Sequence, residues 1–593
     1  MLQMIRRLFS ILPLVLSSNA ISSHTKYLPG FTQSQVYNRY LRNYTFVMTS
    51  VTETSSCQLA RTIGEWSFAP NTLLSLPLDE VEENYVRRDV RQAVFSKVTP
   101  TPLQKNLQLV AVSDNALVSI LDMDPVIANT EEFVQFVAGD KILPSCTPLA
   151  HRYGGHQFGV WASQLGDGRA NLLGEYVNRA GERWELQLKG SGLTPYSRGA
   201  DGRAVLRSSV REFLAAEAMY YLGVPTSRVA ALITSDVGVI RDPLYNGNPV
   251  VEKASVVLRL APSWFRIGSL ELPVKRGETA TLRALLTYLI STSFPELWQK
   301  TEKNLAEACV TFGLEVAKLN YKMWVEWQRV GFVHGVMNSD NISLMGVTID
   351  YGPFGFMPAF NRRYVPNTSD DEARYCYQQQ IRALFFDLEK LRESLGYVIT
   401  SDYNTDPDVK AKLVQEMAEG FRFLRRQSDV DLENMYLKKL GLTKTDHYEV
   451  VEKLLILMED AKADFTATFR QLSEANITEM ENIEATKFWA LKEIKGHKDF
   501  DLFWSMYVAA LKEECVEEEE RKRVMCSVNP CYVLRNWIAQ EAIAEAENGN
   551  FQLVRKVEKI LQRPYERQEE ADRLNFGGKP PTWEKQLKVS CSS

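Results

Sequence analysis

The hydrophobic pattern of this chain changes near residue 280. Between 160 and 260, short apolar runs alternate with turn residues around one helical stretch, Ser209 to Leu222. Beyond 280, apolar residues recur at the spacing of amphipathic helices, first at Leu282 to Ile290 and then at Leu305 to Trp327. A strand-rich part followed by a helix-rich part predicts an α+β fold with two lobes.

A β-hairpin is the clearest element of the strand-rich part. Arg169 to Val177 and Arg183 to Lys189 flank a turn-like Asn178-Arg-Ala-Gly181. Apolar and polar residues alternate in the second segment, which predicts a strand with one buried face. Two further strands are expected, Val229 to Ile240 with an internal turn at Ser235 to Gly238, and Ala254 to Leu260.

Composition and patterning divide the chain into six segments. Residues 53–150 mix short apolar runs with prolines and are expected to form an irregular extension. The predicted division is a targeting leader at 1–52, the extension at 53–150, a small β-rich N-lobe at 151–275, a helical C-lobe at 276–400, a helical C-terminal region at 401–580 and a flexible tail at 581–593.

Composition also excludes some classes of function. The 593 residues include 24% charged side chains with a formal net charge of -5, so the surface offers no broad attraction for nucleic acid. The eight cysteines are scattered without CxxC pairs, which argues against a zinc site or a disulfide scaffold. We therefore expect a mostly reducing environment and no nucleic-acid partner.

A glycine turn is the first candidate for phosphate binding. Gly166-Asp167-Gly168-Arg169 stands directly before a predicted strand. Glycines let backbone N–H groups approach phosphate oxygens, and an adjacent arginine adds charge-assisted hydrogen bonds. An ordinary tight turn explains the same four residues when they are taken alone.

The order of the next residues strengthens the prediction of a phosphate-binding site. Lys189 ends a predicted strand, and Glu212 follows 23 residues later in a predicted helix. A glycine turn, a strand lysine and a helix glutamate, in this order, hold the nucleotide phosphates in protein kinases. Two alternatives stay open: Lys189 is a solvated strand end, and Ser209-Val-Arg-Glu212 is a helix capping box.

A second constellation runs from His334 to Asn341 and continues at Asp350-Tyr-Gly352. By kinase spacing, Asn341 and Asp350 fill the two magnesium positions, and both supply the hard oxygen ligands that Mg²⁺ prefers. The position of the usual base is Val336, which accepts no proton. Asp340 is the carboxylate best placed to replace it, with a turn-capping role as the alternative.

Further arginines lie between these two groups. Asp201-Gly202-Arg203 precedes the predicted helix, and Arg259 and Arg266 are seven residues apart across a proline. Guanidinium groups bind phosphate in a bidentate manner, so these two arginines can converge on one triphosphate. Surface salt bridges are the alternative for such a spacing.

Long stretches of this chain match one known family. They are His151–Gly159, Gln164–Ala170, Gln187–Arg198, His334–Asn341, Asp350–Pro353, Asn529–Asn536 and Ser590–Ser593. The chain resembles the selenoprotein O family over about residues 64 to 593. Members of that family have a protein-kinase-like fold and act as protein adenylyltransferases.

The resemblance implies a direction of transfer. ATP is expected to bind inverted relative to ordinary kinases, so that the α-phosphate faces a Ser, Thr or Tyr hydroxyl of a protein and pyrophosphate leaves. Asp340 becomes the proton acceptor, and Asn341 and Asp350 become the magnesium ligands. The nucleotide-binding residues implied are Gly166, Gly168, Arg169, Lys189, Asp201, Gly202, Arg259 and Arg266, with Glu212 as the partner of Lys189.

The first 52 residues have the composition of a targeting leader. They contain no Asp or Glu, several basic residues and an apolar run, Leu8 to Leu16, that is too short to span a bilayer. A mitochondrial presequence fits this composition, and so does a secretory signal, because Arg6-Arg7 precedes the apolar run. Asn341-Ile-Ser343 is a glycosylation acceptor inside the predicted site, which favours the mitochondrion, as does the family.

Cys591 lies where some members of the family carry selenocysteine. A cysteine in the third position from the terminus is expected to be an exposed thiol that can exchange with another cysteine. We therefore hypothesise redox gating through Cys591, with Cys376 as its candidate partner; an unpaired tail cysteine is the alternative.

Three functional interpretations are consistent with the sequence. They are a protein adenylyltransferase, which is favoured, a kinase that transfers the γ-phosphate, and a catalytically silent nucleotide-binding scaffold.

Overall fold

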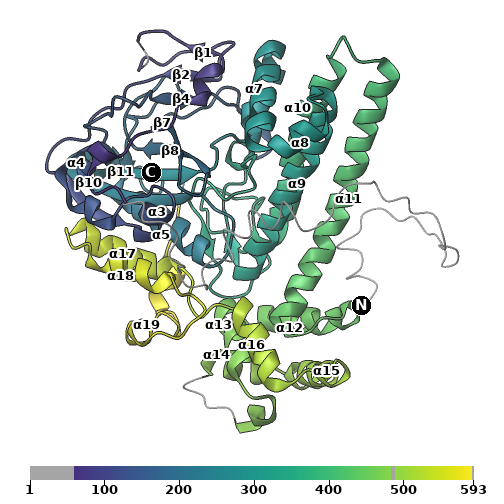
Figure 1. Cartoon of the computed structure of the whole chain (residues 1–593). Helices are drawn as coiled ribbons and strands as arrows, with labels where there is room; N and C mark the ends of the chain where they lie inside the picture. Colours follow the sequence, from purple (N-terminus) through teal and green to yellow (C-terminus); the bar gives the residue numbers. More distant parts are fainter. Residues whose placement is uncertain (1–58, 84, 483–487, 591–593) are drawn as a thin grey trace. The chain divides into compact units, whose positions relative to one another are not determined.

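A nine-stranded mixed sheet forms the N-terminal part of the protein, and helices form most of the rest (Figure 1). The computed structural model describes residues 59–83, 85–482 and 488–590, so the predicted leader lies outside the described residues. The main sheet has the order β1-β2-β4-β7-β8-β11-β10-β3, with β9 paired to β11. The strands are β1 (Leu78–Asp79), β2 (Phe95–Lys97), β3 (Gln108–Val112), β4 (Leu149–His151), β7 (Ala170–Val177), β8 (Arg183–Lys189), β9 (Ala204–Val205), β10 (Arg228–Arg241) and β11 (Val250–Ala261).

Residues 53–150 were expected to be irregular, and the structure corrects this for the described part. Strands β1, β2 and β3 lie in this segment, and all three join the main sheet. They are two, three and five residues long. β1 and β2 are too short to show a two-residue periodicity, and β3, Gln-Leu-Val-Ala-Val, is a nearly continuous apolar run without alternation, so the sequence pattern does not reveal these strands.

Helices cover both faces of the sheet. On one face α5 (Leu206–Tyr221) packs against β10 and β11. On the other face α3 (Asp114–Ser119) and α4 (Glu131–Val137) enclose a second apolar cluster that includes Leu186 and Leu188 of β8. The predicted alternation in β8 is present, but its polar face is also buried, because Glu185 and Gln187 bond to the segment that follows β11 and to β11 itself.

Two details of the sheet lobe differ from the prediction. The capping-box alternative is wrong, because α5 begins at Leu206 and places Ser209 inside the helix, where its hydroxyl bonds to Ser255 at 2.7 Å. The turn expected at Ser235 to Gly238 is a register shift within the continuous strand β10. A bulge and a tight turn share the same glycine-containing sequence signal.

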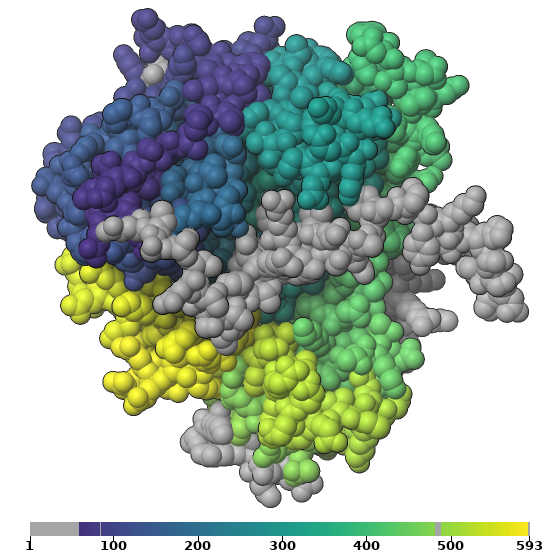
Figure 2. All heavy atoms as spheres, in the orientation of Figure 1, coloured from purple at the N-terminus to yellow at the C-terminus, as the bar shows by residue number. Residues whose placement is uncertain are grey.

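The helical part is built around the 26-residue helix α9, against which α10 and α11 pack. Helices α17 and α18, which come late in the chain, return to the sheet lobe and pack on α5 (Figures 1 and 2). The helices are α6 (Ile267–Arg276), α7 (Thr279–Ser293), α8 (Pro295–Lys300), α9 (Leu305–Val330), α10 (Gln380–Thr400), α11 (Pro407–Lys439), α12 (Tyr448–Ala461), α13 (Phe465–Glu474), α14 (Trp489–Lys495), α15 (Phe500–Glu513), α16 (Glu518–Val528), α17 (Asn536–Glu547), α18 (Gln552–Leu561) and α19 (Glu569–Arg573).

The structure thus has the predicted α+β character, a sheet lobe followed by a large helical part. The long helices predicted around 282–290 and 305–327 are present as α7 and α9. In the described part of the chain, we find no helix with the length and apolar character needed to cross a membrane.

Candidate active site

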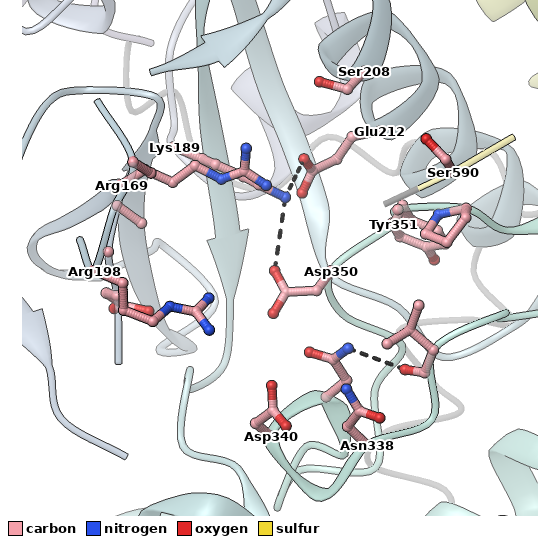
Figure 3. A pocket seen from close by; sticks show the side chains of 18 of the residues that line it. Arg169, Lys189, Arg198, Ser208, Glu212, Asn338, Asp340, Asp350, Tyr351 and Ser590 are labelled. Atoms are coloured by element: carbon pink, nitrogen blue, oxygen red, sulfur yellow. Dashed lines mark hydrogen bonds and ion pairs between the residues drawn. The ribbon is translucent and has the colours of Figure 1, made fainter. Parts of the chain in front are cut away.

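A cavity of about 960 Å³ is lined by residues of both the sheet lobe and the helical part. This volume is at the upper end of the range of roughly 300–1,000 Å³ for small-molecule sites. Nine of the twelve predicted site residues line it: Gly166, Gly168, Arg169, Lys189, Glu212, Arg259, Asp340, Asn341 and Asp350. Figure 3 shows several of them converging from separate elements.

Lys189 is the centre of the sheet-lobe wall. Its Nζ lies 2.7 Å from Oε2 of Glu212 on α5 and 3.8 Å from Oδ1 of Asp350 (Figure 3). Burial lowers the pKa of Lys189, and the charge of Glu212 opposes this effect. The lysine is therefore not a solvated strand end; it is held by an acid on the neighbouring helix, as the order of the residues predicted.

Arg259 and Arg266 converge on Asp350. Nη1 of Arg259 is 2.5 Å from one carboxylate oxygen, and Nη1 of Arg266 is 2.9 Å from the other. Both arginines are buried, so the surface-salt-bridge alternative is wrong. Burial by itself raises the pKa of Asp350, but the charges of Arg259, Arg266 and Lys189 outweigh it and hold the pKa well below its usual value.

The glycine turn is shaped by a second turn that lies behind it. A Cβ on Gly166 would lie 2.5 Å from the ring of Tyr196, and a Cβ on Gly168 would lie 2.7 Å from the Tyr196 carbonyl oxygen. Thr194 Oγ1 donates to the Asp167 carbonyl at 2.7 Å, and Ser197 Oγ donates to the Gly168 carbonyl at 2.5 Å. Internal packing therefore requires these glycines, whatever ligand faces the other side of the turn.

Asp340 faces the cavity from the opposite wall, in the short 3₁₀ helix Ser339–Asn341. Burial raises the pKa of Asp340 to about 6, although Arg266 and a hydrogen bond from Gln157 lower it. Gln157 Nε2 donates to Oδ2 at 3.3 Å, and Oδ1 is buried without a hydrogen-bond partner in the described part of the protein. A carboxylate with a pKa near 6 and an unused oxygen can accept a proton at neutral pH.

The segment from His334 to Asn341 is held in place by its surroundings. His334 Nε2 donates to the Ile349 carbonyl at 2.9 Å, and this links the segment to Asp350. Asn338 accepts from the hydroxyl of Tyr375 at 2.7 Å and from the backbone N–H of Phe158 at 3.1 Å. The segment is therefore fixed by contacts from the sheet lobe and from the region before α10.

The donor set of Asn341 and Asp350 fits a hard cation. Asn341 Nδ2 donates to the Val336 carbonyl at 3.0 Å, which leaves its amide oxygen as the ligating atom. Mg²⁺ usually takes only one or two protein oxygens, together with water and phosphate. Among the described residues, no group of three or more His, Cys, Asp or Glu side chains is arranged for a metal. A metal ion at Asp350 would compete with Arg259 and Arg266 for its oxygens.

Three predicted residues do not line the cavity. Arg266 lies behind its wall and reaches it through Asp350. Asp201 pairs with Arg241 at 2.7 Å, and the backbone of Gly202 folds against Gly192, whose N–H donates to the Gly202 carbonyl at 3.0 Å. A nucleotide contact for Asp201 and Gly202 stays a prediction.

Several residues that line the cavity had no predicted role. Gln157, Arg198 and Ser590 belong to stretches that carry the family resemblance, but the resemblance assigned no function to them. Arg198 extends into the cavity in Figure 3 from the end of the turn behind the glycines. Val589 and Ser590, from the C-terminal tail, also line the cavity, and no spacing rule links them to residues more than 200 positions away.

Only one of the two cysteines of the redox hypothesis, Cys376, lies among the described residues. Cys591 lies outside them, so its pairing with Cys376 stays a prediction. Cys376 itself is buried, and burial raises the pKa of its thiol.

Comparison with known proteins shows the family to which this chain belongs. Residues 82–562 match the family model described as protein adenylyltransferase SelO. A mouse protein named "Protein adenylyltransferase SelO, mitochondrial" is 37% identical over 610 residues, which cover 85% of this chain and 89% of the mouse protein. A "Protein nucleotidyltransferase YdiU" of Tolumonas auensis is 39% identical over 527 residues, which cover 87% of this chain and 98% of that protein.

The chain belongs to the SelO family, and it is a protein adenylyltransferase. Its nucleotide substrate is ATP, and its acceptors are proteins. The family has many bacterial members. One is a "Protein nucleotidyltransferase YdiU" of Flavobacterium johnsoniae, which is 39% identical over 530 residues. The family as a whole is therefore not confined to mitochondria.

Proposed function

We propose that this chain transfers AMP from ATP to Ser, Thr or Tyr hydroxyls at the 960 Å³ cavity, within a protein-kinase-like fold. The observation that carries the proposal is the meeting of Lys189, Asp350 and Asp340 around one cavity. Val336 lines the same cavity at the position where a kinase has its base. The usual phosphoryl-transfer base is therefore missing, and a different carboxylate is present.

The sheet-lobe wall is the proposed phosphate site. Arg169, Lys189 and Arg259 bring positive charge to the cavity, beside the backbone of the Gly166–Gly168 turn. Arg266 lies behind this wall and adds its charge through Asp350, to which its Nη1 donates at 2.9 Å. Asp201 and Gly202 belong to the proposal through the family resemblance alone.

Asn341 and Asp350 are the proposed Mg²⁺ ligands. When bound, a divalent ion neutralises phosphate charge and orients the nucleotide for in-line displacement. The protein's part is to keep Asp350 ionised, which Arg259, Arg266 and Lys189 do.

Asp340 is the proposed proton acceptor. The acceptor hydroxyl loses its proton to the Asp340 carboxylate while its oxygen bonds to the α-phosphorus. The bond between the α-phosphorus and the bridging oxygen breaks, and pyrophosphate leaves. Gln157 Nε2 donates to Oδ2 of this carboxylate at 3.3 Å and holds its orientation during this step.

We also propose a mitochondrial location, on the acid-free leader and on the printed name of the mouse relative. Redox control through Cys591 remains part of the proposal, and its expected sign is a protected thiol at Cys591 in peptide mapping under oxidising conditions.

ATP labelled separately at the α- and γ-phosphates tests the proposed chemistry. Incorporation of the α label alone into an acceptor protein supports AMP transfer. Incorporation of the γ label alone would make the chain a kinase, and incorporation of neither label would make it a scaffold.

A further inference from the structure

The C-terminal tail of the chain lies at the edge of the cavity. The 3₁₀ helix Thr582–Gln586 leads to Leu587, which packs on the main apolar core. The next residues then reach the cavity, and Val589 and Ser590 form part of its lining. In Figure 3, Ser590 lies on the side of the cavity that also carries Tyr351 and Glu212.

The tail is held there by backbone pairing. Val589 forms a parallel β-bridge with Asn367, and its carbonyl accepts from the N–H of Thr368 at 3.0 Å. The hydroxyl of Ser590, a residue that is only 6% exposed, donates to the Pro243 carbonyl. Because Pro243 lies between β10 and β11, the tail joins the sheet lobe to the region before α10.

The segment that receives the tail is tied to the residues around Asp340. Asn367 is buried, and its Nδ2 donates to the Gly335 carbonyl at 3.0 Å. A few residues later, the Tyr375 hydroxyl donates to Asn338 at 2.7 Å. An extended strand paired at Asn367 and Thr368 is therefore placed at a fixed position relative to Asp340, two residues beyond Asn338.

We infer that the backbone edge at Asn367–Thr368 is the docking site for the acceptor protein, which binds as an extended, hydroxyl-bearing segment, and that Val589–Ser590 occupies this site in the free enzyme. This inference rests on the proposed function. Pairing through main-chain atoms accepts many side-chain sequences, since the backbone groups provide the affinity. The tail has the character expected of such a segment, because it is extended, pairs through its backbone and carries a serine, whose hydroxyl is hydrogen-bonded to the Pro243 carbonyl.

Truncation after Lys588 tests the inference, because it removes Val589 and Ser590 but keeps Leu587, which packs on the core. The truncation also removes Cys591, so both chains are assayed in dithiothreitol, where no disulfide of Cys591 contributes. We expect the KM for an unfolded acceptor, β-casein, to fall threefold or more, with kcat and the KM for ATP within twofold of the full chain. Lys588→Ala, a change at an exposed residue, is the matched control and should leave all three constants unchanged. Thermal unfolding of each chain reports whether folding is affected.

A synthetic peptide with the sequence of residues 586–593 gives the converse test. Added to the truncated chain, it should inhibit competitively against β-casein and not against ATP, and a scrambled peptide should inhibit at least threefold less. An unchanged KM for β-casein after truncation, or competition of the peptide with ATP, would overturn the inference.

A binding measurement separates this inference from the proposed function. Fluorescence anisotropy of a labelled β-casein peptide reports docking without any transfer. If neither label of ATP is transferred by either chain, the proposed function fails, but threefold tighter peptide binding by the truncated chain still supports the docking site. Equal binding by the truncated and full chains rejects the docking site, whatever the transfer assay gives.

Discussion

The two walls of the cavity hold their charged groups in different ways. On the sheet-lobe wall, Lys189 and Arg259 are both ion-paired, to Glu212 and Asp350. On the opposite wall, the Asp340 carboxylate accepts a hydrogen bond from the neutral side chain of Gln157, and no ion pair of it is found among the described residues. The first wall pairs its cations with carboxylates, and the second holds a carboxylate without an ion pair, as the proposed proton acceptor requires.

Under the proposed function, this difference separates the residues that bind ATP from the residue that accepts the proton. Substitutions on the sheet-lobe wall should act mainly on the affinity for ATP, whereas substitutions around Asp340 should act mainly on kcat. Asp350 belongs to both, because it pairs with the cations of the first wall and is the proposed metal ligand.

Replacement of Asp350 should have the largest effect. Asp350→Ala is expected to lower AMP transfer by about 10⁴-fold, because a catalytic metal contributes several kcal/mol to the transition state. Binding of ATP in the absence of divalent ions should persist, since the cations at the site lose an internal competitor. Radiolabel transfer and calorimetric titration measure the two quantities; wild-type transfer by this variant would contradict the proposed metal site.

Replacement of Asp340 should impair the transfer step and leave ATP binding nearly unchanged. Asp340→Asn is expected to lower kcat by about 10³-fold, within the range of roughly 10²–10⁴ for a lost general base. The KM for ATP should stay within about twofold, because the amide keeps the size of the carboxylate and no phosphate contact is assigned to it. Steady-state kinetics measure both constants, and a kcat near that of the wild type would leave the proton acceptor unassigned.

Replacement of Lys189 should change the KM for ATP more than kcat. Lys189→Ala removes a charge-assisted phosphate contact, worth about 1.5–3 kcal/mol, and should raise the KM for ATP by roughly 10- to 150-fold. Lys189→Arg keeps the charge and should recover part of the affinity. An effect on kcat alone, with an unchanged KM for ATP, would show that Lys189 acts in the transfer step and not in ATP binding.

Removal of the Gln157 amide should have the smallest effect. A neutral hydrogen bond contributes about 0.5–1.5 kcal/mol, so Gln157→Ala should lower kcat by roughly 2- to 12-fold. Gln164→Ala is the matched control, because Gln164 bonds to Arg88 and Val90 outside the cavity. Equal kinetics for the two variants would show that Gln157 does not position Asp340.

The sequence predicted the parts of this site that depend on local order. The hairpin of β7 and β8 is found within one residue of its expected bounds, and Lys189 meets Glu212 as the kinase-like order of residues required. The hairpin follows from the alternation of apolar and polar residues in its strands. The contact between Lys189 and Glu212 follows from the position of α5 shortly after β8 in the chain, so residues close together in the sequence determine both features.

The features that the sequence did not predict depend on contacts between distant segments. Arg259 and Arg266 were expected to converge on phosphate, and in the structure they converge on Asp350, about 90 positions away. The glycines at 166 and 168 were attributed to a ligand, whereas the turn at Tyr196 already excludes a side chain there. Val589 and Ser590 reach the cavity through one β-bridge, which leaves no pattern in the sequence.

A crystal structure of this chain with a non-hydrolysable ATP analogue and Mg²⁺ would test the central claim most directly. Inverted binding predicts that the α-phosphorus lies next to the Asp340 carboxylate, with the β- and γ-phosphates against Lys189 and the glycine turn. A γ-phosphorus next to Asp340, with the α-phosphorus deeper in the cavity, would contradict AMP transfer by this site.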